Sequence, residues 1–323
     1  MLETIKLVAG TVADKDLVPA FTHIHIYDGR IQGMDGRAVA IDAACPEMAG
    51  IHASVPADRF LRAVTACDGE PRISEKEGKL LIRRKSFQAT LPLMAHADYP
   101  KTDAVPEDVE RMPIKPGFVG VLKRLKPFIS QDASRPWTVG VQFKDGNSYA
   151  TNNAILVSLP YAACPLTMRL PTVAVDELIR INQDPKEVAF FNGAFYFFYA
   201  SFWVRVLPMI IEWPNVEDML SKFDYASLPA IPGQLLDAVR KIAHFHPDPK
   251  FPVVLFNKEG VHTMDGNHKA SVEGMELAEA KFRAEIITLV LNEAIKGDFS
   301  KWPAPMPFYG MDKLRGMVVG VKT

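Results

Sequence analysis

One long phrase occurs three times along this chain, in residues 14–39, 131–157 and 246–272. Proline and glycine keep their places in all three copies: Pro19, Pro136 and Pro252, then Gly29, Gly146 and Gly260. The copies follow one another at intervals of about one small domain. A chain that repeats so long a unit is an array, so we predict one arrangement of helices and strands used three times.

Each copy predicts the same order of elements. An amphipathic helix comes first, over residues 5–13, 118–129 and 235–245, because apolar side chains recur there at i, i+3 and i+4. A bend with proline then leads into an alternating strand, of which residues 23–27 are the clearest. A turn with glycine closes this strand, at Asp28-Gly29, Asp145-Gly146 or Glu259-Gly260.

A second helix and a strand pair complete each copy. The second helix is predicted over residues 58–66, 176–182 and 276–294, and prolines at 56 and 171 suit the entry to the first two. The strand pair turns at Gly78 in the first copy and at Asn192-Gly193 in the second, where Asn-Gly is a strong hairpin signal. The third copy closes in a shorter hairpin over residues 306–323.

The composition is that of a globular protein. With 323 residues, 48% of them hydrophobic, the chain can bury a sizeable core in two or three domains. The apolar run 188–211 is interrupted by Asn192, Gly193 and Arg205, which favours buried strands over a membrane span. Three widely spaced cysteines, and an amino terminus unlike a signal peptide, predict a cytoplasmic protein with free thiols.

Residues 55–100, VPADRFLRAVTACDGEPRISEKEGKLLIRRKSFQATLPLMAHADYP, closely resemble the first domain of the bacterial DNA polymerase III beta sliding clamp. Residues 122–153 resemble the helix, strand and turn of its second domain, and residues 235–256 the first helix and following strand of its third. The turn reads ATNNAIL where the family has ATDGHRL, and the third copy is abbreviated. The resemblance fits a bacterial or a phage-encoded member alike.

This resemblance implies an α+β fold of three tandem clamp domains, over residues 1–110, 111–223 and 224–323. Each domain would have two helices packed on antiparallel sheet, and two chains would close head to tail into a ring with the helices facing the hole. The implied function is that of a processivity factor, which encircles double-stranded DNA without sequence preference and tethers the replicative polymerase. The implied partners also include the clamp loader, and no membrane, cofactor, metal or catalytic residue is expected.

The charge of the chain is compatible with weak contacts to DNA. A net charge of −1 argues against a protein that holds nucleic acid by bulk basicity. Every predicted helix nevertheless carries a cation, although any single one is as well explained as a solvated surface residue. Scattered cations would touch phosphates weakly and let the ring slide. The residues expected to contact DNA are Lys6, Arg59, Arg62, Lys123, Arg124, Lys126, Arg180, Arg240, Lys241, Lys281 and Arg283.

The resemblance also implies two protein-binding sites. A pocket between the second and third domains accepts a short apolar peptide in the family. Its walls would here be Thr138, Thr151, Asn153, Ile155, Leu156, Val318 and Val319, with a rim less charged than in the family because Ala154 and Ile155 replace an imidazole and a basic side chain. The contact between subunits would include Phe245 and His246.

Other chemistries find little support in the sequence. The pairs His23/His25 and His244/His246 lack a third metal ligand, and no phosphate loop or nucleophile motif is present. One alternative stays open: a repeat-built ligand-binding protein or enzyme whose groove is lined by the aromatic side chains of residues 195–203. A strand with bulky groups on both faces is more typical of a buried core strand.

Overall fold

The computed structural model describes residues 1–95, 98–100, 102, 105–162, 164–274 and 277–321. One order of elements occurs three times: a helix, four strands, a second helix and three strands. The first copy consists of α1 (Leu2–Ala9), β1 (His23–Tyr27), β2 (Arg30–Met34), β3 (Val39–Ala44), β4 (Ala53–Pro56), α2 (Ala57–Thr65), β5 (Arg72–Lys76), β6 (Lys79–Arg84) and β7 (Phe87–Pro92).

The second copy follows a short strand, β8 (Met112–Pro113). It consists of α3 (Phe118–Leu125), β9 (Gly140–Lys144), β10 (Asn147–Thr151), β11 (Ile155–Pro160), β12 (Met168–Pro171), α4 (Thr172–Ile181), β13 (Glu187–Phe191), β14 (Ala194–Phe198) and β15 (Phe202–Val206).

The third copy follows a short helix, α5 (Val216–Leu220). It consists of α6 (Gln234–Ala243), β16 (Val253–Asn257), β17 (Gly260–His262), β18 (Lys269–Ala270), β19 (Ala280–Arg283), α7 (Ala284–Glu293), β20 (Ala294–Gly297), β21 (Met306–Gly310) and β22 (Arg315–Val318). The predicted alternation of helix, strand, helix and strands is therefore present in all three copies, but with four strands in place of the one predicted after the first helix and three in place of the predicted pair.

The chain packs into two compact units whose limits differ from those of the sequence copies. Unit 1 contains residues 1–119 and 173–208, and unit 2 contains residues 120–172 and 209–323. Because the last strands of the second copy pair with the first copy, one copy contributes to both units.

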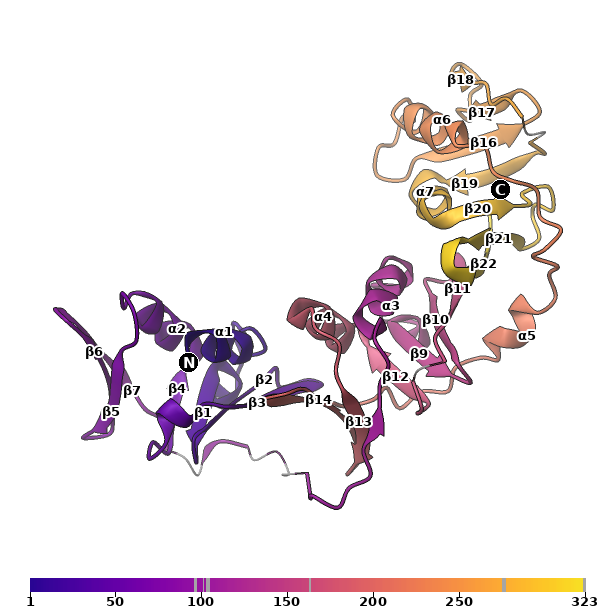
Figure 1. The fold of residues 1–323 in the computed structure, drawn as a ribbon. Coiled ribbons are helices and arrows are strands. Elements are labelled where there is room, and N and C mark those ends of the chain that lie inside the picture. The colour runs from indigo at the N-terminus through magenta and orange to yellow at the C-terminus, as the bar shows by residue number, and fades with distance from the viewer. Residues whose placement is uncertain (96–97, 101, 103–104, 163, 275–276, 322–323) are drawn as a thin grey trace. The chain divides into compact units, whose positions relative to one another are not determined.

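Unit 1 is built on an eight-stranded sheet of order β4-β1-β2-β3-β15-β14-β13-β8. Helices α1, α2 and α4 cover one face of it (Figure 1). Gly33 in β2 lets α1 approach, since a Cβ there would lie 2.9 Å from the side chain of Val8. A separate three-stranded sheet, β5-β6-β7, buries Leu80, Ile82 and Leu91 on one of its faces.

Unit 2 contains a seven-stranded sheet of order β12-β9-β10-β11-β22-β21-β20 and a four-stranded sheet of order β18-β17-β16-β19. Helix α6 packs beside α7 and over β16 and β17, and α7 packs on β19 to β21. Apolar residues at helical spacing, such as Leu235, Val239 and Ile242 of α6, make the buried face that joins these layers.

The aromatic residues of β14 belong to the core of unit 1. Phe195, Tyr196, Phe197, Phe198 and Tyr199 are all less than 9% exposed. The ring of Phe197 lies 5.5 Å from that of Phe118. Buried aromatic side chains are what a strand covered on both faces requires, so the interpretation as a core strand is confirmed for Phe195 to Phe198, while Tyr199 is buried just after the strand.

The predicted helix over residues 276–294 is wrong over residues 277–283, because α7 begins only at Ala284; residue 276 lies outside the described residues. Residues Ala280–Arg283 form β19, which pairs antiparallel with Val253–Phe256 of β16. Ala280 and Phe282 are buried while Lys281 and Arg283 are half-buried, and this alternation is the period of a strand. Lys281 and Arg283 therefore lie on a strand and not on a helix as expected.

Candidate functional site

The helices of unit 1 form a row in which α1 lies between α2 and α4. Arg180 of α4 joins this row: its Nη2 donates to the carbonyl oxygen of Leu7 at 2.7 Å and to Oε1 of Glu177 at 2.5 Å. The hydroxyl of Thr11 also donates to the Glu177 carboxylate, whose side chain is only 9% exposed. The guanidinium of Arg180 thus compensates a buried charge.

Unit 2 has a corresponding row of α3, α7 and α6. Arg124 of α3 pairs with Glu293 of α7 at 2.8 Å and with Asp312 at 2.9 Å. Arg240 of α6 donates to Oδ1 of Asn292 on α7 at 3.0 Å. Three expected DNA contacts, Arg124, Arg180 and Arg240, are therefore engaged in joining helices.

The other expected cations lie in more open surroundings. Lys6 pairs with Glu3 and Arg62 with Asp58, both at 2.8 Å and both on the helix surface. Such exposed pairs contribute little energy and exchange readily with another anion. The remaining helical cations, Arg59, Lys123, Lys126 and Lys241, are exposed, whereas Lys281 and Arg283 lie over the rings of Trp302 and Phe251.

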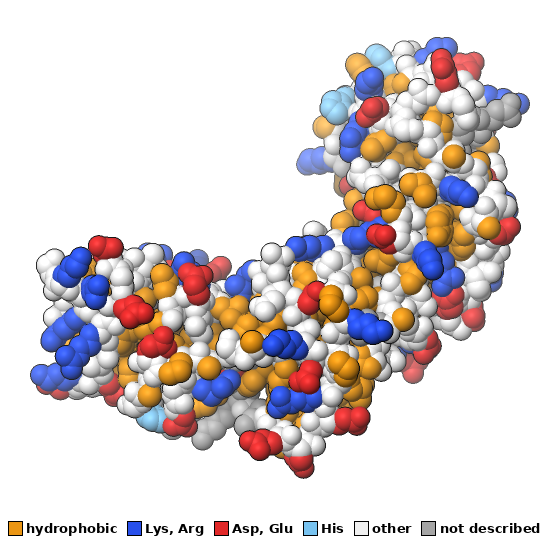
Figure 2. All heavy atoms as spheres, viewed as in Figure 1, with side chains coloured by type: hydrophobic (Ala, Val, Ile, Leu, Met, Phe, Trp, Pro, Cys, Tyr) orange, Lys and Arg blue, Asp and Glu red, His pale blue; other side chains and the backbone are white. Residues whose placement is uncertain are grey.

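Basic and acidic side chains are mixed on the surface of each unit. Figure 2 shows lysine and arginine interspersed with aspartate and glutamate over the face in view, with apolar side chains between them. A mixed surface of this kind agrees with the net charge of −1. It suits contacts to phosphate that are individually weak.

A small apolar cavity of about 80 Å³ lies in unit 2, over the turn between β10 and β11. Among the described residues that line it, none carries an ionisable side chain. Five of the seven residues predicted for the peptide pocket line this cavity: Thr151, Asn153, Ile155, Leu156 and Val319. They are joined by Trp137, Ala154, Pro214, Val216, Met219 and Met317.

Thr138 and Val318, the other two predicted residues, are buried and are not among the described residues that line the cavity. The Thr138 hydroxyl is buried and donates to the carbonyl oxygen of Arg135 at 2.8 Å. Val318 is fully buried and pairs in register with Ile155. Both side chains support the pocket from the core.

The turn of the pocket is fixed by its own polar side chains. Oδ1 of Asn152 accepts the backbone N–H groups of Ala154 at 3.1 Å and Ile155 at 2.8 Å. Asn153 has φ of 72°, a left-handed conformation that asparagine tolerates better than most residues. The backbone N–H of Val319 donates to the carbonyl oxygen of Ala154 at 2.8 Å, which brings the end of β22 against the turn.

Helix α5 forms one wall of the cavity, and its residues were not predicted from the sequence to line the pocket. Glu217 of α5 accepts Arg315 Nη2 on both carboxylate oxygens, and it accepts the hydroxyl of Tyr149 at 2.9 Å. Burial and the neighbouring Glu217 carboxylate raise the pKa of Tyr149, so its hydroxyl stays a donor at neutral pH. These contacts hold Val216 and Met219 at the cavity.

No protein-family model matches the chain, and no curated protein matches it in sequence. Solved structures do match. The DNA polymerase III subunit beta from Pseudomonas aeruginosa has a TM-score of 0.81 at 18% identity, over 100% of this chain and 97% of that one. The chain has the fold of a bacterial beta sliding clamp.

Two more clamps show the same likeness. The DNA polymerase sliding clamp from Bacillus subtilis has a TM-score of 0.78 at 16% identity, and the Helicobacter pylori beta clamp bound to a DNA ligase peptide has 0.79 at 14%. Each match covers 100% of this chain and 97% of the clamp. The resemblance predicted from the three sequence copies is thus confirmed for the fold.

The two residues predicted at the clamp's subunit contact lie just after α6. Phe245 is 55% exposed, and its ring stacks on that of His268 with centroids 4.2 Å apart. Nδ1 of His246 accepts the backbone N–H of Asp248 at 3.1 Å. Phe245 thus presents an exposed aromatic ring just after α6.

None of the described helices is both long and apolar enough to cross a membrane. In the described part of the chain, no group of three or more histidine, cysteine or acidic residues could hold a metal ion. Of the histidines considered as ligands, His25 instead stacks on Tyr99 with ring centroids 4.5 Å apart.

Proposed function

We propose that this chain is a DNA sliding clamp: a ring of two chains that encircles duplex DNA and tethers the replicative polymerase. The full-length likeness to bacterial beta clamps supports this proposal. In it, the chain has three clamp domains, over residues 1–110, 111–223 and 224–323, and works in the cytoplasm without catalytic residues of its own. The alternative of an aromatic ligand groove loses support because β14 is buried.

The observation that carries the ring is the pairing of strands between copies. The third strand of the first copy, β3, pairs with the last strand of the second, β15, and β11 pairs in the same way with β22 of the third copy. In each case the third strand of one copy pairs with the last strand of the next copy. In the part of the chain that the structure describes, the third strand of the third copy, β18, and the last strand of the first copy, β7, have no such partner and lie at sheet edges. Pairing of β18 with β7 of a second chain would join two chains head to tail and leave neither edge exposed.

Charge favours the same pairing over association of like surfaces. On the exposed face of the β5–β7 sheet, Arg72 lies opposite Arg83 and Lys76 opposite Lys79. Like charges in register repel one another and would also repel the same face of an identical sheet stacked on it from a second chain. A head-to-tail contact avoids this repulsion.

In the proposed ring, the helix rows supply weak contacts to phosphate and the cavity in unit 2 receives an apolar peptide from the polymerase or the clamp loader. The Helicobacter pylori clamp binds a DNA ligase peptide, and a peptide with leucine and an aromatic residue would suit the uncharged cavity here by burial of apolar surface.

The deciding experiment compares circular with linear DNA. Protein loaded on a nicked circle by its cognate loader should remain bound through gel filtration and leave when a restriction enzyme cuts the circle. Phe245→Asp, which places a charge at the proposed subunit contact, should sediment as a monomer and fail to be retained. Equal loss from circular and linear DNA would refute the ring.

A further inference from the structure

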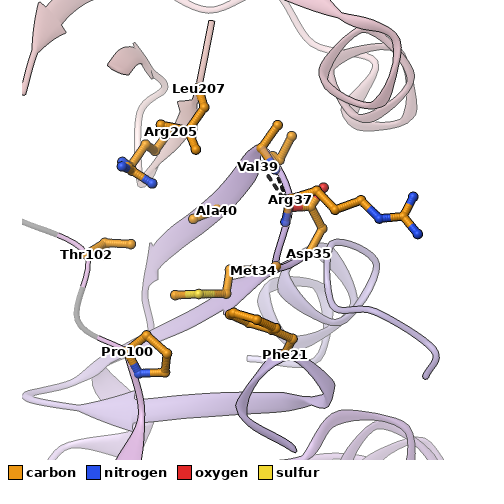
Figure 3. A pocket seen from close by; sticks show the side chains of 12 residues that line it. Phe21, Met34, Asp35, Arg37, Val39, Ala40, Pro100, Thr102, Arg205 and Leu207 are labelled. Atoms are coloured by element: carbon orange, nitrogen blue, oxygen red, sulfur yellow. Dashed lines mark hydrogen bonds between the residues drawn. The ribbon is translucent and has the colours of Figure 1, made fainter. Parts of the chain in front are cut away.

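A second cavity, of about 240 Å³, lies in unit 1 over the turn between β2 and β3 (Figure 3). Met34, Val39 and Leu207 contribute apolar surface, and Asp35 and Arg205 contribute charge. Figure 3 shows Arg205 across the cavity from Met34 and Phe21. Nothing in the proposed clamp function uses this site.

This cavity is the counterpart of the peptide pocket in unit 2. In the register of the repeat, Asp35 occupies the place of Asn152, at the same distance from the turn glycine. Oδ1 of Asp35 accepts the backbone N–H groups of residues 37, 38 and 39 at 2.8–2.9 Å, as Oδ1 of Asn152 accepts those of residues 154 and 155.

The closing strand is placed in the same way in both sites. The backbone N–H of Leu207, just after β15, donates to the carbonyl oxygen of Ala38 at 2.8 Å. Val319, just after β22, makes the corresponding bond to Ala154, also at 2.8 Å. Each cavity therefore lies where the turn of one copy meets the last strand of the next.

The chemistry of the two cavities differs. The described lining of the pocket in unit 2 has no ionisable side chain, whereas the cavity in unit 1 has Arg205, which is half-buried and makes no side-chain hydrogen bond or ion pair with a described residue. Oδ2 of Asp35 is buried and has no partner in the described part of the chain either. A half-buried guanidinium and a buried carboxylate oxygen both gain free energy from a complementary partner.

We propose that the cavity in unit 1 is a second peptide-binding site, for an extended segment that places an apolar side chain beside a carboxylate. The carboxylate would accept hydrogen bonds from Arg205, and a backbone N–H of the segment would donate to Oδ2 of Asp35. The apolar side chain would pack on Met34, Val39 and Leu207. This site requires neither DNA nor occupancy of the pocket in unit 2.

Methionine methyl groups can report on the two cavities separately. Met34 lines the cavity in unit 1, and Met219 and Met317 line the pocket in unit 2. The full chain, labelled with ¹³C at methionine methyls and assigned by Met→Leu variants, is titrated with acetyl-Gly-Leu-Asp-Leu-Phe-amide. The Met34 signal should shift and saturate. The matched peptide with Asn in place of Asp should bind there about tenfold more weakly.

Arg205→Ala should remove the peptide-induced shift of Met34 and leave the Met219 and Met317 signals as in the wild type. The Met34 signal of the peptide-free variant, at its wild-type position, confirms that unit 1 is folded. Arg83→Ala, on the exposed face of the β5–β7 sheet in the same unit and outside the cavity, is the control for a general loss of positive charge and should leave the Met34 shift unchanged. A Met34 signal that the acidic peptide does not move overturns the proposal, as does equal binding of the two peptides at Met34. A shift produced by duplex DNA or by protein concentration alone would assign the cavity to another occupant.

Because Met219 and Met317 are read in the same spectra, failure of the proposed polymerase pocket is a separate result. If the peptide shifts the Met34 signal but not the Met219 and Met317 signals, the proposed polymerase pocket is refuted and the second peptide-binding site is supported.

Discussion

The guanidinium of Arg315 on β22 binds the carboxylate of Glu217 on α5, with Nη2 at 2.6 and 2.7 Å from the two oxygens. This pair fixes the short helix that forms one wall of the pocket in unit 2. A helix of five residues has little stability of its own, so its position depends on such contacts.

Arg315→Ala should therefore weaken peptide binding while the fold survives. Arg315 makes a charge-assisted contact that is only partly exposed, and we expect affinity for a polymerase-derived peptide to fall about five- to tenfold. Fluorescence anisotropy measures this change. Lys269→Ala, which removes an exposed ion pair with Glu259 in the same unit, is the control and should leave affinity unchanged.

Met219 allows a test of the pocket that does not disturb the core. It lines the cavity and is 39% exposed, so Met219→Glu places a charge at the apolar site with little cost to stability. Peptide binding should fall at least about tenfold. Met311→Glu, at a more exposed methionine outside the cavity, should have no effect. Ile155→Glu would be ambiguous, because Ile155 is buried and the charge could unfold the sheet.

Arg180→Ala should destabilise the fold, because it leaves Glu177 buried without its cation. We expect the free energy of unfolding to fall by roughly 2 kcal/mol in urea titrations. The double change Arg180→Ala with Glu177→Gln should recover much of this stability. Arg62→Ala removes a pair on the exposed surface and should cost less than about 0.5 kcal/mol. Equal destabilisation by Arg180→Ala and Arg62→Ala would show that the buried pair is unimportant.

Binding to DNA is better tested at Arg59 and Lys241, which are exposed on α2 and α6. Charge reversal at each should lower the slope of log affinity against log salt by about 0.9 for each phosphate that the protein no longer neutralises. Lys258→Glu changes the net charge equally, but it lies in the turn between β16 and β17 and should leave the slope unchanged. Identical slopes in all three variants would exclude the helix rows as the DNA-facing surface.

The cysteines should be slow to react near neutral pH. Burial raises the pKa of Cys164 to about 11, and burial together with the Glu47 carboxylate raises the pKa of Cys45 to about 12. The reactive thiolate is therefore scarce at neutral pH, and labelling by a disulfide reagent should accelerate about tenfold per pH unit as pH rises. Labelling in denaturant supplies the reference rate. Fast labelling of the folded protein at neutral pH would contradict these environments.

The parts of the fold that the sequence predicted are those set by local signals. The turns at Gly29, Gly78 and Gly146 all have positive φ, which glycine adopts without strain, and the predicted hairpins form around them. The pocket residues from Thr151 to Leu156 were predicted from the resemblance to the clamp family, which places the pocket at this turn.

The parts that were missed depend on distant contacts. Residues 216–232 are rich in proline and charge, a composition typical of a linker. Glu217 nevertheless binds Arg315 and Tyr149, which are far away in the sequence, and α5 forms. Lys281 and Arg283 fit a helical pattern, but β16 provides a strand edge that residues 280–283 pair with. Pairing between residues far apart in the sequence cannot be predicted from the local sequence pattern.

The pairing of β3 with β15 means that the repeated sequence is not the smallest piece that can fold. A fragment ending near residue 110 would keep the elements of the first copy but would lack the strand that covers Val39, Ile41 and Ala43. Its uncovered edge could pair with other chains, so such a fragment should aggregate when expressed alone. A single copy therefore needs a neighbouring copy to complete its sheet, since the second copy covers the open edge of the first and the third covers that of the second.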